Sequence, residues 1–253
     1  MRALVTTAVP AERDAVAAAF TAPAREHTVP GADLTRLVLP ADRPTADGPP
    51  DGDVLVLDLL AGGVGPASAA ASTAAALTAA ALAGEPYDVV VSAGIGGGFQ
   101  PGAPLGSLVL ADEITVADLG AETPDGFAPV TELGFGTVTH RPPESLVREI
   151  AAVTGARTGA VLTVNTVTGS AERAAELRRR HPRALAEAME GFGVAAAAAA
   201  HGVPVLEIRA VSNPVGPRDR AAWRIGDALA ALTGAFGKLP PVLESWNPHD
   251  LTH

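Results

Sequence analysis

The chain of 253 residues is long enough to bury a substantial core, and its 47% hydrophobic and 18% charged residues exclude a disordered protein. A formal net charge of −10 disfavours a nucleic acid polymer as partner, because such partners need a basic surface. No cysteine is present, and the six histidines lack metal-ligand spacing, so we expect no disulfide, no metal and no other cofactor.

Six short apolar runs predict β-strands. They are near-continuous rather than alternating, which is typical of strands that are covered on both faces. The predicted strands are Ala3–Thr7, Val54–Leu59, Asp88–Ser92, Ser107–Ala111, Ala160–Val164 and Val205–Val211.

Helical segments are predicted between and after these strands. They are Ala11–Phe20, Pro66–Ala83, Pro143–Thr154, Ser170–Arg180, Ala184–His201 and Ala221–Leu239. The segment Ala184–His201 includes the alanine run Ala195–Ala200, and alanine is the best helix former. The alternation of strands and helices predicts an α/β fold with helices on both sides of a sheet.

Two segments are less regular. Residues Thr21–Asp53 are rich in Pro, Asp and Gly, and we expect a hairpin or meander with long loops there. The residues from Pro240 to His253 carry Pro240-Pro241 and are expected to form an extended, partly ordered terminus. We therefore expect a single domain over residues 1–239 and a C-terminal tail over residues 240–253.

The uncharged stretch Leu59–Gly84 has the length of a membrane span but is interrupted by glycines and Pro66. It is better interpreted as a strand end, a glycine turn and a buried helix. Glu12 and Arg13 interrupt the N-terminal apolar stretch, which does not have the arrangement of a signal peptide. These features predict a soluble, cytoplasmic protein that has no membrane partner.

Ligands of open α/β sheets gather beyond the carboxyl ends of the strands, so the segments after the predicted strands are candidate site segments. Two of them, residues 61–65 and 94–98, are glycine-rich turns that allow a ligand to approach the backbone. Neither is a dinucleotide fingerprint, since Phe99 stands where the third glycine of G-x-G-x-x-G belongs.

Four features occur together and in order along the chain. They are Glu12, Ser92-Ala93-Gly94-Ile95-Gly96-Gly97-Gly98-Phe99, Ala188-Met189-Glu190-Gly191 in a predicted helix, and Arg209-Ala210-Val211-Ser212-Asn213 at the end of a predicted strand. With them the chain, from about residue 1 to 237, resembles the nucleoside phosphorylase/nucleosidase superfamily, in the branch of the methylthioadenosine/adenosylhomocysteine nucleosidases. Its SAGIGGGF, EAMEGFG and SNPVGPRDRAAWRI stretches are most like those of the futalosine hydrolases.

The resemblance implies a three-layer αβα sandwich with a central mixed sheet, the phosphorylase/hydrolase-like fold. It also implies roles for the matching residues. Glu12 would activate the attacking water, Glu190 would bind the ribose hydroxyls, and Met189 would lie under the ribose. The remaining positions would surround the base and sugar: Ile95, Gly96, Gly97, Val167, Thr168, Ser212 and Asn213.

These residue types suit the cleavage of an N-glycosidic bond. The reaction needs a nucleophile below C1′ and a hydrogen-bond donor for the departing base, and a carboxylate can hold both ribose hydroxyls. Each glutamate alone has a simpler explanation: one on an early helix is usually solvated, and Glu190 could pair with an arginine. A negatively charged Glu12 would also repel phosphate, which favours hydrolysis over phosphorolysis.

Asn213 stands where the adenine nucleosidases have an aspartate that handles proton donation to the base. An amide cannot act as an acid, but it presents both a donor and an acceptor, which suits a 6-oxopurine such as hypoxanthine. Asn213 is therefore a candidate catalytic residue that activates the leaving group by hydrogen bonding. An asparagine before Pro214 also serves simply to cap a turn.

Futalosine bears a benzoate beyond C5′, so its pocket should hold a cation and apolar surface. Candidate residues are Arg218, Arg220, Trp223, Arg224 and Phe99. An arginine–carboxylate contact is one interpretation, and a solvated loop is the other. Nothing in the sequence decides between them.

The sequence thus predicts a nucleosidase that hydrolyses futalosine to hypoxanthine and dehypoxanthine futalosine in menaquinone biosynthesis. The alternatives are a methylthioadenosine/adenosylhomocysteine-type nucleosidase, a purine nucleoside phosphorylase, or a non-catalytic nucleoside-binding protein. The small-molecule nucleoside substrate is the expected partner. The resemblance also implies a homodimer or larger homo-oligomer.

Overall fold

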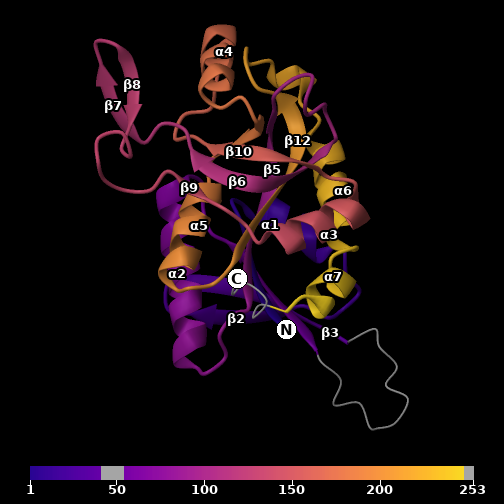
Figure 1. Cartoon of the computed structure of the whole chain (residues 1–253). Coiled ribbons are helices and arrows are strands. Elements are labelled where there is room, and N and C mark those ends of the chain that lie inside the picture. Colours follow the sequence, from indigo (N-terminus) through magenta and orange to yellow (C-terminus); the bar gives the residue numbers. More distant parts are fainter. Residues whose placement is uncertain (41–53, 248–253) are drawn as a thin grey trace.

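The computed structural model describes residues 1–40 and 54–247 (Figure 1). Its strands lie where the six apolar runs predicted them, usually with longer bounds, and six further strands are added. The strands are β1 (Arg2–Thr7), β2 (Arg25–Val29), β3 (Ala32–Leu39), β4 (Leu55–Ala61), β5 (Val89–Gly98), β6 (Leu108–Val116), β7 (Gly120–Thr123), β8 (Gly126–Pro129), β9 (Thr139–His140), β10 (Arg157–Thr163), β11 (Ala184–Ala188) and β12 (Val205–Pro214).

The helices confirm most of the predicted segments. They are α1 (Pro10–Ala17), α2 (Pro66–Leu82), α3 (Glu144–Thr154), α4 (Ala171–Arg180), α5 (Gly191–Ala200), α6 (Ile225–Phe236), α7 (Pro240–Ser245) and a short 3₁₀ helix at Arg220–Ala222. The uncharged stretch from Leu59 is a strand end, a glycine turn and α2, as predicted. Across residues 1–40 and 54–247, no helix is long and apolar enough to cross a membrane.

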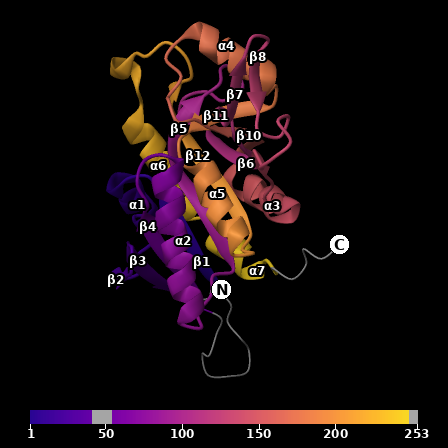
Figure 2. The ribbon, with the colours of Figure 1, turned by 90° about the vertical axis from the view of Figure 1, so that its left-hand side faces the viewer.

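One mixed sheet runs through the molecule in the order β11-β10-β6-β12-β5-β1-β4-β3-β2, with β9 added beside β6. Helices α2 and α5 pack side by side on one face, where they bury mostly alanine and valine (Figure 2). Helices α1, α3, α6 and α7 bury their apolar side chains on the other face. The predicted three-layer αβα sandwich with a central mixed sheet is therefore confirmed.

The sheet curls at one end until β11 meets β5, because β11 pairs with both β10 and β5. Strands β5, β12, β6, β10 and β11 thus close into a ring. The crowding explains the glycines of β5, since a Cβ at Gly96 would lie 2.8 Å from the carbonyl oxygen of Glu187 and one at Gly98 would lie 2.2 Å from that of Ala103. Residues 94–98, predicted as a turn, are therefore part of a strand, and glycine is needed there for close packing.

The predicted helix Ala184–His201 is wrong over its first part. Residues Ala184–Ala188 form β11, because pairing with two neighbouring strands outweighs the helix propensity of alanine. Helix α5 begins only at Gly191, so Met189 and Glu190 lie at a strand–helix junction and not inside a helix. Ser212 and Asn213 belong to β12 itself instead of following it.

Two irregular segments differ from expectation in part. The hairpin predicted within Thr21–Asp53 is confirmed as β2–β3, and β3 also pairs with β4. Residues 41–53 lie outside the described residues. Residues 240–245, expected to be extended, form α7, whose Val242 and Leu243 are buried in the core. Proline is tolerated in the first turn of a helix, where its missing N–H is not needed. The division into one domain and a tail stays a prediction.

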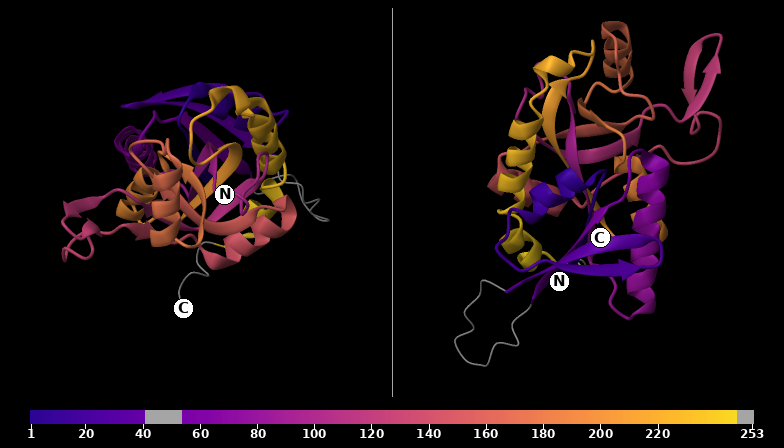
Figure 3. Two further views of the ribbon diagram at one scale, coloured as in Figure 1. Left: turned by 90° about the horizontal axis from the view of Figure 1, so that it is seen from above. Right: turned by 180° about the vertical axis from the view of Figure 1, so that it is seen from behind.

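The β7–β8 hairpin projects from the body of the molecule beside α4 (Figure 3, right). The guanidinium of Arg180 on α4 lies 4.4 Å from the ring centroid of Phe127 on β8 and anchors the hairpin. The following segment exposes Leu133 and Phe135 to solvent. No residue of β7 or β8 is fully buried, so this hairpin adds little to the core.

Candidate active site

A cavity of about 480 Å³ opens at the carboxyl ends of the parallel strands β1, β5 and β12. Its wall also includes the end of β11 and the segments that follow β4 and β10. All predicted site residues line it except Thr168, which lies buried behind the wall. The structure thus brings together, from five separate segments, nearly the full set that the sequence pattern indicated.

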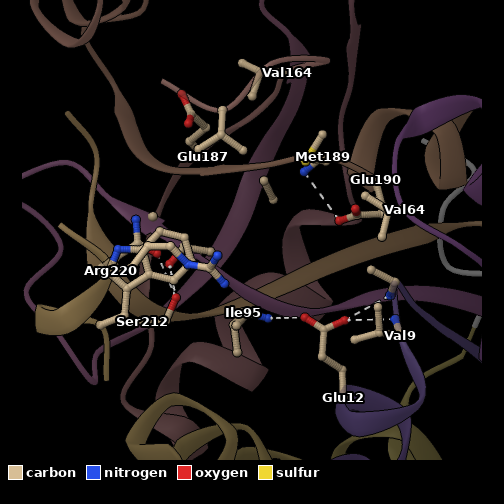
Figure 4. A pocket seen from close by; sticks show the side chains of 17 residues that line it. Val9, Glu12, Val64, Ile95, Val164, Glu187, Met189, Glu190, Ser212 and Arg220 are labelled. Atoms are coloured by element: carbon tan, nitrogen blue, oxygen red, sulfur yellow. Dashed lines mark hydrogen bonds between the residues drawn. The ribbon is translucent and has the colours of Figure 1, made fainter. Parts of the chain in front are cut away.

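Glu12 stands on the first turn of α1 and is almost fully buried. One carboxylate oxygen accepts hydrogen bonds from the backbone N–H groups of Ala8 (3.0 Å) and Val9 (3.3 Å), and the other from that of Ile95 (2.8 Å) (Figure 4). Burial raises the pKa of Glu12, while Arg209 and these N–H groups partly oppose the rise. The carboxylate is thus held in one position and biased toward accepting a proton.

Glu190 lies across the cavity from Glu12 and is also buried (Figure 4). Its Oε1 accepts from the N–H of Gly65 (3.3 Å), and its Oε2 from the N–H of Met189 (3.3 Å) and from Nη1 of Arg209 (3.2 Å). A position at the N-terminus of α5 also favours a carboxylate. Both oxygens are oriented and keep acceptor capacity for a ligand.

Arg209 is fully buried on β12 behind the cavity wall, and its guanidinium donates hydrogen bonds to three side chains. It donates to Glu207 (2.9 Å), Glu190 (3.2 Å) and the hydroxyl of Ser92 (3.0 Å). Gly94 separates Arg209 from Glu12: a Cβ there would lie 2.6 Å from the Glu12 carboxylate and 2.9 Å from Nη1 of Arg209. The positive charge of Arg209 therefore interacts with three buried carboxylates, those of Glu207, Glu190 and Glu12.

Glu207 completes this cluster without reaching the cavity. Burial raises its pKa, and its Oε2 has no hydrogen-bond partner among residues 1–40 and 54–247. Its carboxylate packs against Gly191, where a Cβ would lie 2.1 Å from Oε2. The sequence interpretation missed Arg209 and Glu207 as site residues. One sequence feature could have indicated them: Glu207 and Arg209 are charged residues two positions apart, and hence on one face, in an otherwise apolar strand.

Glu187 on β11 is a third carboxylate of the cavity wall that the sequence interpretation missed. It accepts from the backbone N–H of Thr168 (2.8 Å) and, through a short contact, from the Thr168 hydroxyl. Burial raises the pKa of Glu187, and the two bonds from Thr168 oppose that rise. Thr168 thus fixes the segment that carries Val167 into the cavity instead of lining the cavity itself.

Asn213 and Glu187 flank Gly97, since β12 and β11 pair with β5 at that residue. The Ser212 hydroxyl donates to Oδ1 of Asn213 (2.8 Å), and Nδ2 of Asn213 donates to the carbonyl of Pro214 (3.1 Å). Asn213 lies within β12, and its side chain does not make the bond from a later backbone N–H that caps a turn. One N–H and one lone pair of the amide stay available to a ligand.

The mouth of the cavity carries apolar and cationic side chains. Val64 and Val167 are exposed there, together with Arg220 and the partly buried Trp223. The other three candidates for the 5′ end do not line the cavity: Phe99 is buried in a separate core cluster, Arg224 pairs with exposed Asp227, and Arg218 stacks on Trp223 from outside the lining.

In the part of the chain that the structure describes, no group of His, Cys, Asp or Glu is arranged to hold a metal ion.

The fold and this cavity place the chain in a known class. A family model described as the Phosphorylase superfamily matches residues 52–238, and the chain belongs to this family. The resemblance noted in the sequence is therefore confirmed.

Among curated proteins, the chain is 72% identical to a futalosine hydrolase of Streptomyces coelicolor, covering 99% of this chain and 100% of that protein. It is 43% identical to a futalosine hydrolase of Acidothermus cellulolyticus, over 94% and 90% of the two chains.

Solved structures share the fold at low sequence identity. A mutant futalosine hydrolase of Helicobacter pylori aligns with a TM-score of 0.74 and 17% identity, covering 97% of this chain and all of that one. A 5'-methylthioadenosine/S-adenosylhomocysteine nucleosidase of Neisseria meningitidis, in complex with methylthio-immucillin-A, aligns with a TM-score of 0.73 and 20% identity, over 97% and 99%.

Proposed function

We propose that this chain hydrolyses the N-glycosidic bond of futalosine, releasing hypoxanthine and dehypoxanthine futalosine. The observation that carries the proposal is the 72% identity to a futalosine hydrolase over essentially the full length of both proteins. The cavity supports it, since three buried carboxylates face one space of about 480 Å³, the size expected of a small-molecule site.

Glu12 is the general base of the proposed mechanism. Its carboxylate removes a proton from a water whose oxygen bonds to C1′ as the C1′–N9 bond breaks. The bonding electron pair leaves with the hypoxanthine anion, which takes a proton from solvent, and Glu12 returns its proton to solvent before the next turnover. Burial raises the pKa of Glu12, which strengthens the carboxylate as a base. The three backbone N–H groups keep it aimed at the reacting carbon.

Glu190 holds the ribose in this proposal. It accepts from the 2′- and 3′-hydroxyls, with Met189 under the sugar. Arg209 and two backbone N–H groups already fix the carboxylate, so little ordering is needed when the substrate binds. As positive charge develops at C1′, the ionised carboxylate stabilises the transition state.

Asn213 and Ser212 receive the leaving base, beside Ile95, Gly96 and Gly97. The free N–H of the Asn213 amide donates to N7 or O6 of hypoxanthine, and its oxygen is held by the Ser212 hydroxyl. Val167, fixed through Thr168 and Glu187, packs on the base. The amide activates the leaving group by hydrogen bonding, because it has no acidic proton to transfer.

Hydrolysis is favoured over phosphorolysis by the charge of the wall. Glu12, Glu187 and Glu190 line the cavity, and the buried Arg209 is already engaged by carboxylates. A phosphate ion at C1′ would therefore meet like charge without a free arginine.

The deciding assay incubates purified protein with futalosine, methylthioadenosine and inosine, each with and without phosphate, and follows base release. We expect hypoxanthine from futalosine, at a rate that phosphate does not change. Release of adenine in preference to hypoxanthine, or a strict need for phosphate, would overturn the proposal. Saturable binding of nucleosides without any base release would instead identify a binding protein.

We further propose that the chain acts in the cytoplasm, in menaquinone biosynthesis, as a homodimer or larger homo-oligomer. The exposed Leu133 and Phe135 after the projecting hairpin are candidate contact residues of such an assembly. Light scattering behind size-exclusion chromatography should give at least twice the chain mass of 25.3 kDa. A monomer at micromolar concentration would contradict this part of the proposal.

A further inference from the structure

The cavity has a buried end and an exposed mouth, and the two ends differ in chemistry. Glu12, Glu190 and Ser212 are at most 5% exposed, whereas Val64 and Val167 at the mouth are 54% and 41% exposed. A nucleoside whose ribose reaches both glutamates fills the buried end. A group attached beyond its C5′ atom must then extend toward the mouth.

Arg220 is the one cationic side chain that lines this cavity within residues 1–40 and 54–247. It is exposed at the mouth, and none of the ion pairs in the described chain uses it. Its neighbour Arg224, in contrast, pairs with Asp227 at 3.3 Å. The charge of Arg220 is therefore free to meet an anionic group of a ligand.

Trp223 and the local backbone hold Arg220 in place. The guanidinium carbon lies 5.7 Å from the Trp223 ring centroid, and Trp223 itself lines the cavity. Asp219 caps the short 3₁₀ helix by accepting from the N–H of Ala221 (3.1 Å), and the N–H of Arg224 donates to the carbonyl of Ser212 (2.8 Å). This segment is thus tied to the strand end that carries Ser212 and Asn213.

We propose that Arg220 binds the carboxylate of an aromatic acid carried beyond C5′ of the nucleoside, with Trp223 against the aromatic ring. The inference rests on the proposed function, which gives the substrate a benzoate at that place. A guanidinium binds a carboxylate with two parallel hydrogen bonds, and a tryptophan provides flat apolar surface for a ring.

The charge of the rest of the wall gives this arginine a second effect. Glu12, Glu187 and Glu190 would repel a carboxylate placed anywhere deeper. A substrate with an acid at one end therefore enters base first and leaves its carboxylate at the mouth. Arg220 is a specificity-determining residue in this scheme and takes no part in bond cleavage.

Arg218 offers a matched control, because its guanidinium carbon lies 5.6 Å from the same ring but it does not line the cavity. The experiment compares Arg220→Ala and Arg218→Ala with the wild type on futalosine, futalosine methyl ester and inosine. Inosine has the same base and ribose without the 5′ extension, and the ester removes only the negative charge.

We expect Arg220→Ala to lower kcat/KM for futalosine by about 10- to 100-fold, mainly through KM, since hydrogen bonds to charged groups are of this strength. The same variant should leave turnover or competitive binding of inosine unchanged. Arg218→Ala should match the wild type throughout. For the methyl ester, wild type and Arg220→Ala should become equal, because the charge that Arg220 recognises is gone.

An equal loss for futalosine and inosine would overturn the inference by showing that Arg220 supports the base end or the fold. So would a KM for futalosine that does not rise in Arg220→Ala, or an unchanged advantage of wild type on the ester. If the wild type releases no hypoxanthine from futalosine, the proposed function fails instead. Calorimetric binding of futalosine then tests Arg220 without turnover, with the same fold-change expected in Kd.

Discussion

The molecule buries charge at both ends of its parallel strands, and the two clusters are built differently. The first, which we name the basal cluster, lies near the amino ends of β1 and β5 and consists of Asp58, Glu85, Arg36, Arg2 and Tyr87. Asp58 accepts from Arg36 at 2.7 and 2.8 Å and from the Tyr87 hydroxyl at 2.7 Å. Arg2 lies 3.5 Å from the same carboxylate and 3.0 Å from Glu85, so two cations face two anions.

The second, which we name the pocket cluster, consists of Glu12, Glu190, Glu207 and Arg209 at the carboxyl ends. Here three carboxylates face one guanidinium, and Glu207 keeps an oxygen without a hydrogen-bond partner in the described chain. Burial raises the pKa of Glu12 and of Glu207. Removal of one partner from a compensated buried ion pair is strongly destabilising. Buried carboxylates with a raised pKa are instead typical of functional sites. The two clusters should therefore respond differently to the loss of a charge.

The largest effect is expected for Glu12→Gln. Gln keeps the size of the side chain but cannot take a proton, so kcat should fall by about 10²- to 10⁴-fold, the usual contribution of a general base. Substrate binding should change little. The melting temperature should fall only slightly, because removal of a charge from an anion-rich cluster offsets the loss of one acceptor oxygen for the backbone N–H groups.

Steady-state kinetics and thermal unfolding measure both parts. Asp14→Asn is the matched control, since Asp14 lies on the same helix but is exposed and pairs only with Arg13. Wild-type rates in Glu12→Gln would remove Glu12 from the mechanism. A fall in melting temperature as large as that expected for a broken buried ion pair would show that the pocket cluster stabilises the fold, and it would contradict the contrast between the two clusters.

Asp58→Asn should show the opposite behaviour. Removal of one partner from a buried ion pair costs about 3–5 kcal/mol, and here two arginines and a tyrosine lose their common acceptor. Turnover should remain at the wild-type level, because the basal cluster does not reach the cavity.

Urea unfolding followed by circular dichroism measures this loss. Glu85→Gln is the control within the same cluster: Glu85 is half exposed, and its removal should cost less than about 1 kcal/mol. An Asp58→Asn variant that is as stable as wild type, or one that is stable but inactive, would contradict the assignment of stability to this end.

The contrast between the clusters also explains what could be predicted from the sequence. Apolar runs define strands and helices locally, so the αβα layers and most element positions were predicted correctly. Residues 184–188 were not, because alanine favours a helix and only the curled sheet, which places β10 and β5 on either side, makes this segment a strand. Such pairing depends on residues far apart in the chain.

The same limit applies to the site. Glu12, Glu190 and Asn213 were found because their sequence surroundings resemble a family, and the structure places all three in one cavity. Arg209 and Glu207 were visible only as two charges in an apolar strand, and Glu187 as one more glutamate in a predicted helix. Their importance comes from contacts across the sheet, which local patterns do not contain.

Gly191→Ala should produce a smaller effect that reports on the pocket cluster alone. The new Cβ would lie 2.1 Å from Oε2 of Glu207 and 2.2 Å from Oε1, so the carboxylate or the start of α5 must move. Overpacking of this kind costs about 1–3 kcal/mol. Glu190, the residue before Gly191, should move with the start of α5, so kcat/KM should fall.

Gly226→Ala provides the control, since Gly226 lies in the first turn of α6 with no atom near its missing Cβ. Chemical unfolding and kinetics of both variants are compared. If Gly191→Ala were as stable and active as Gly226→Ala, the close packing of Glu207 against α5 would be wrong.

The finest test is the pH dependence of the wild type. Glu12 must be ionised to act as a base, and burial raises its pKa above the ordinary 4.5, with Arg209 partly opposing. Activity should therefore be lost as the pH falls, with the midpoint of the acidic limb of kcat/KM above 4.5.

Glu207→Gln removes one carboxylate that competes for the charge of Arg209, so more of that charge acts on Glu12. The limb should then move toward lower pH, while Glu85→Gln in the basal cluster leaves it in place. A limb that stays fixed in Glu207→Gln would mean that the charges of the pocket cluster do not act as one unit.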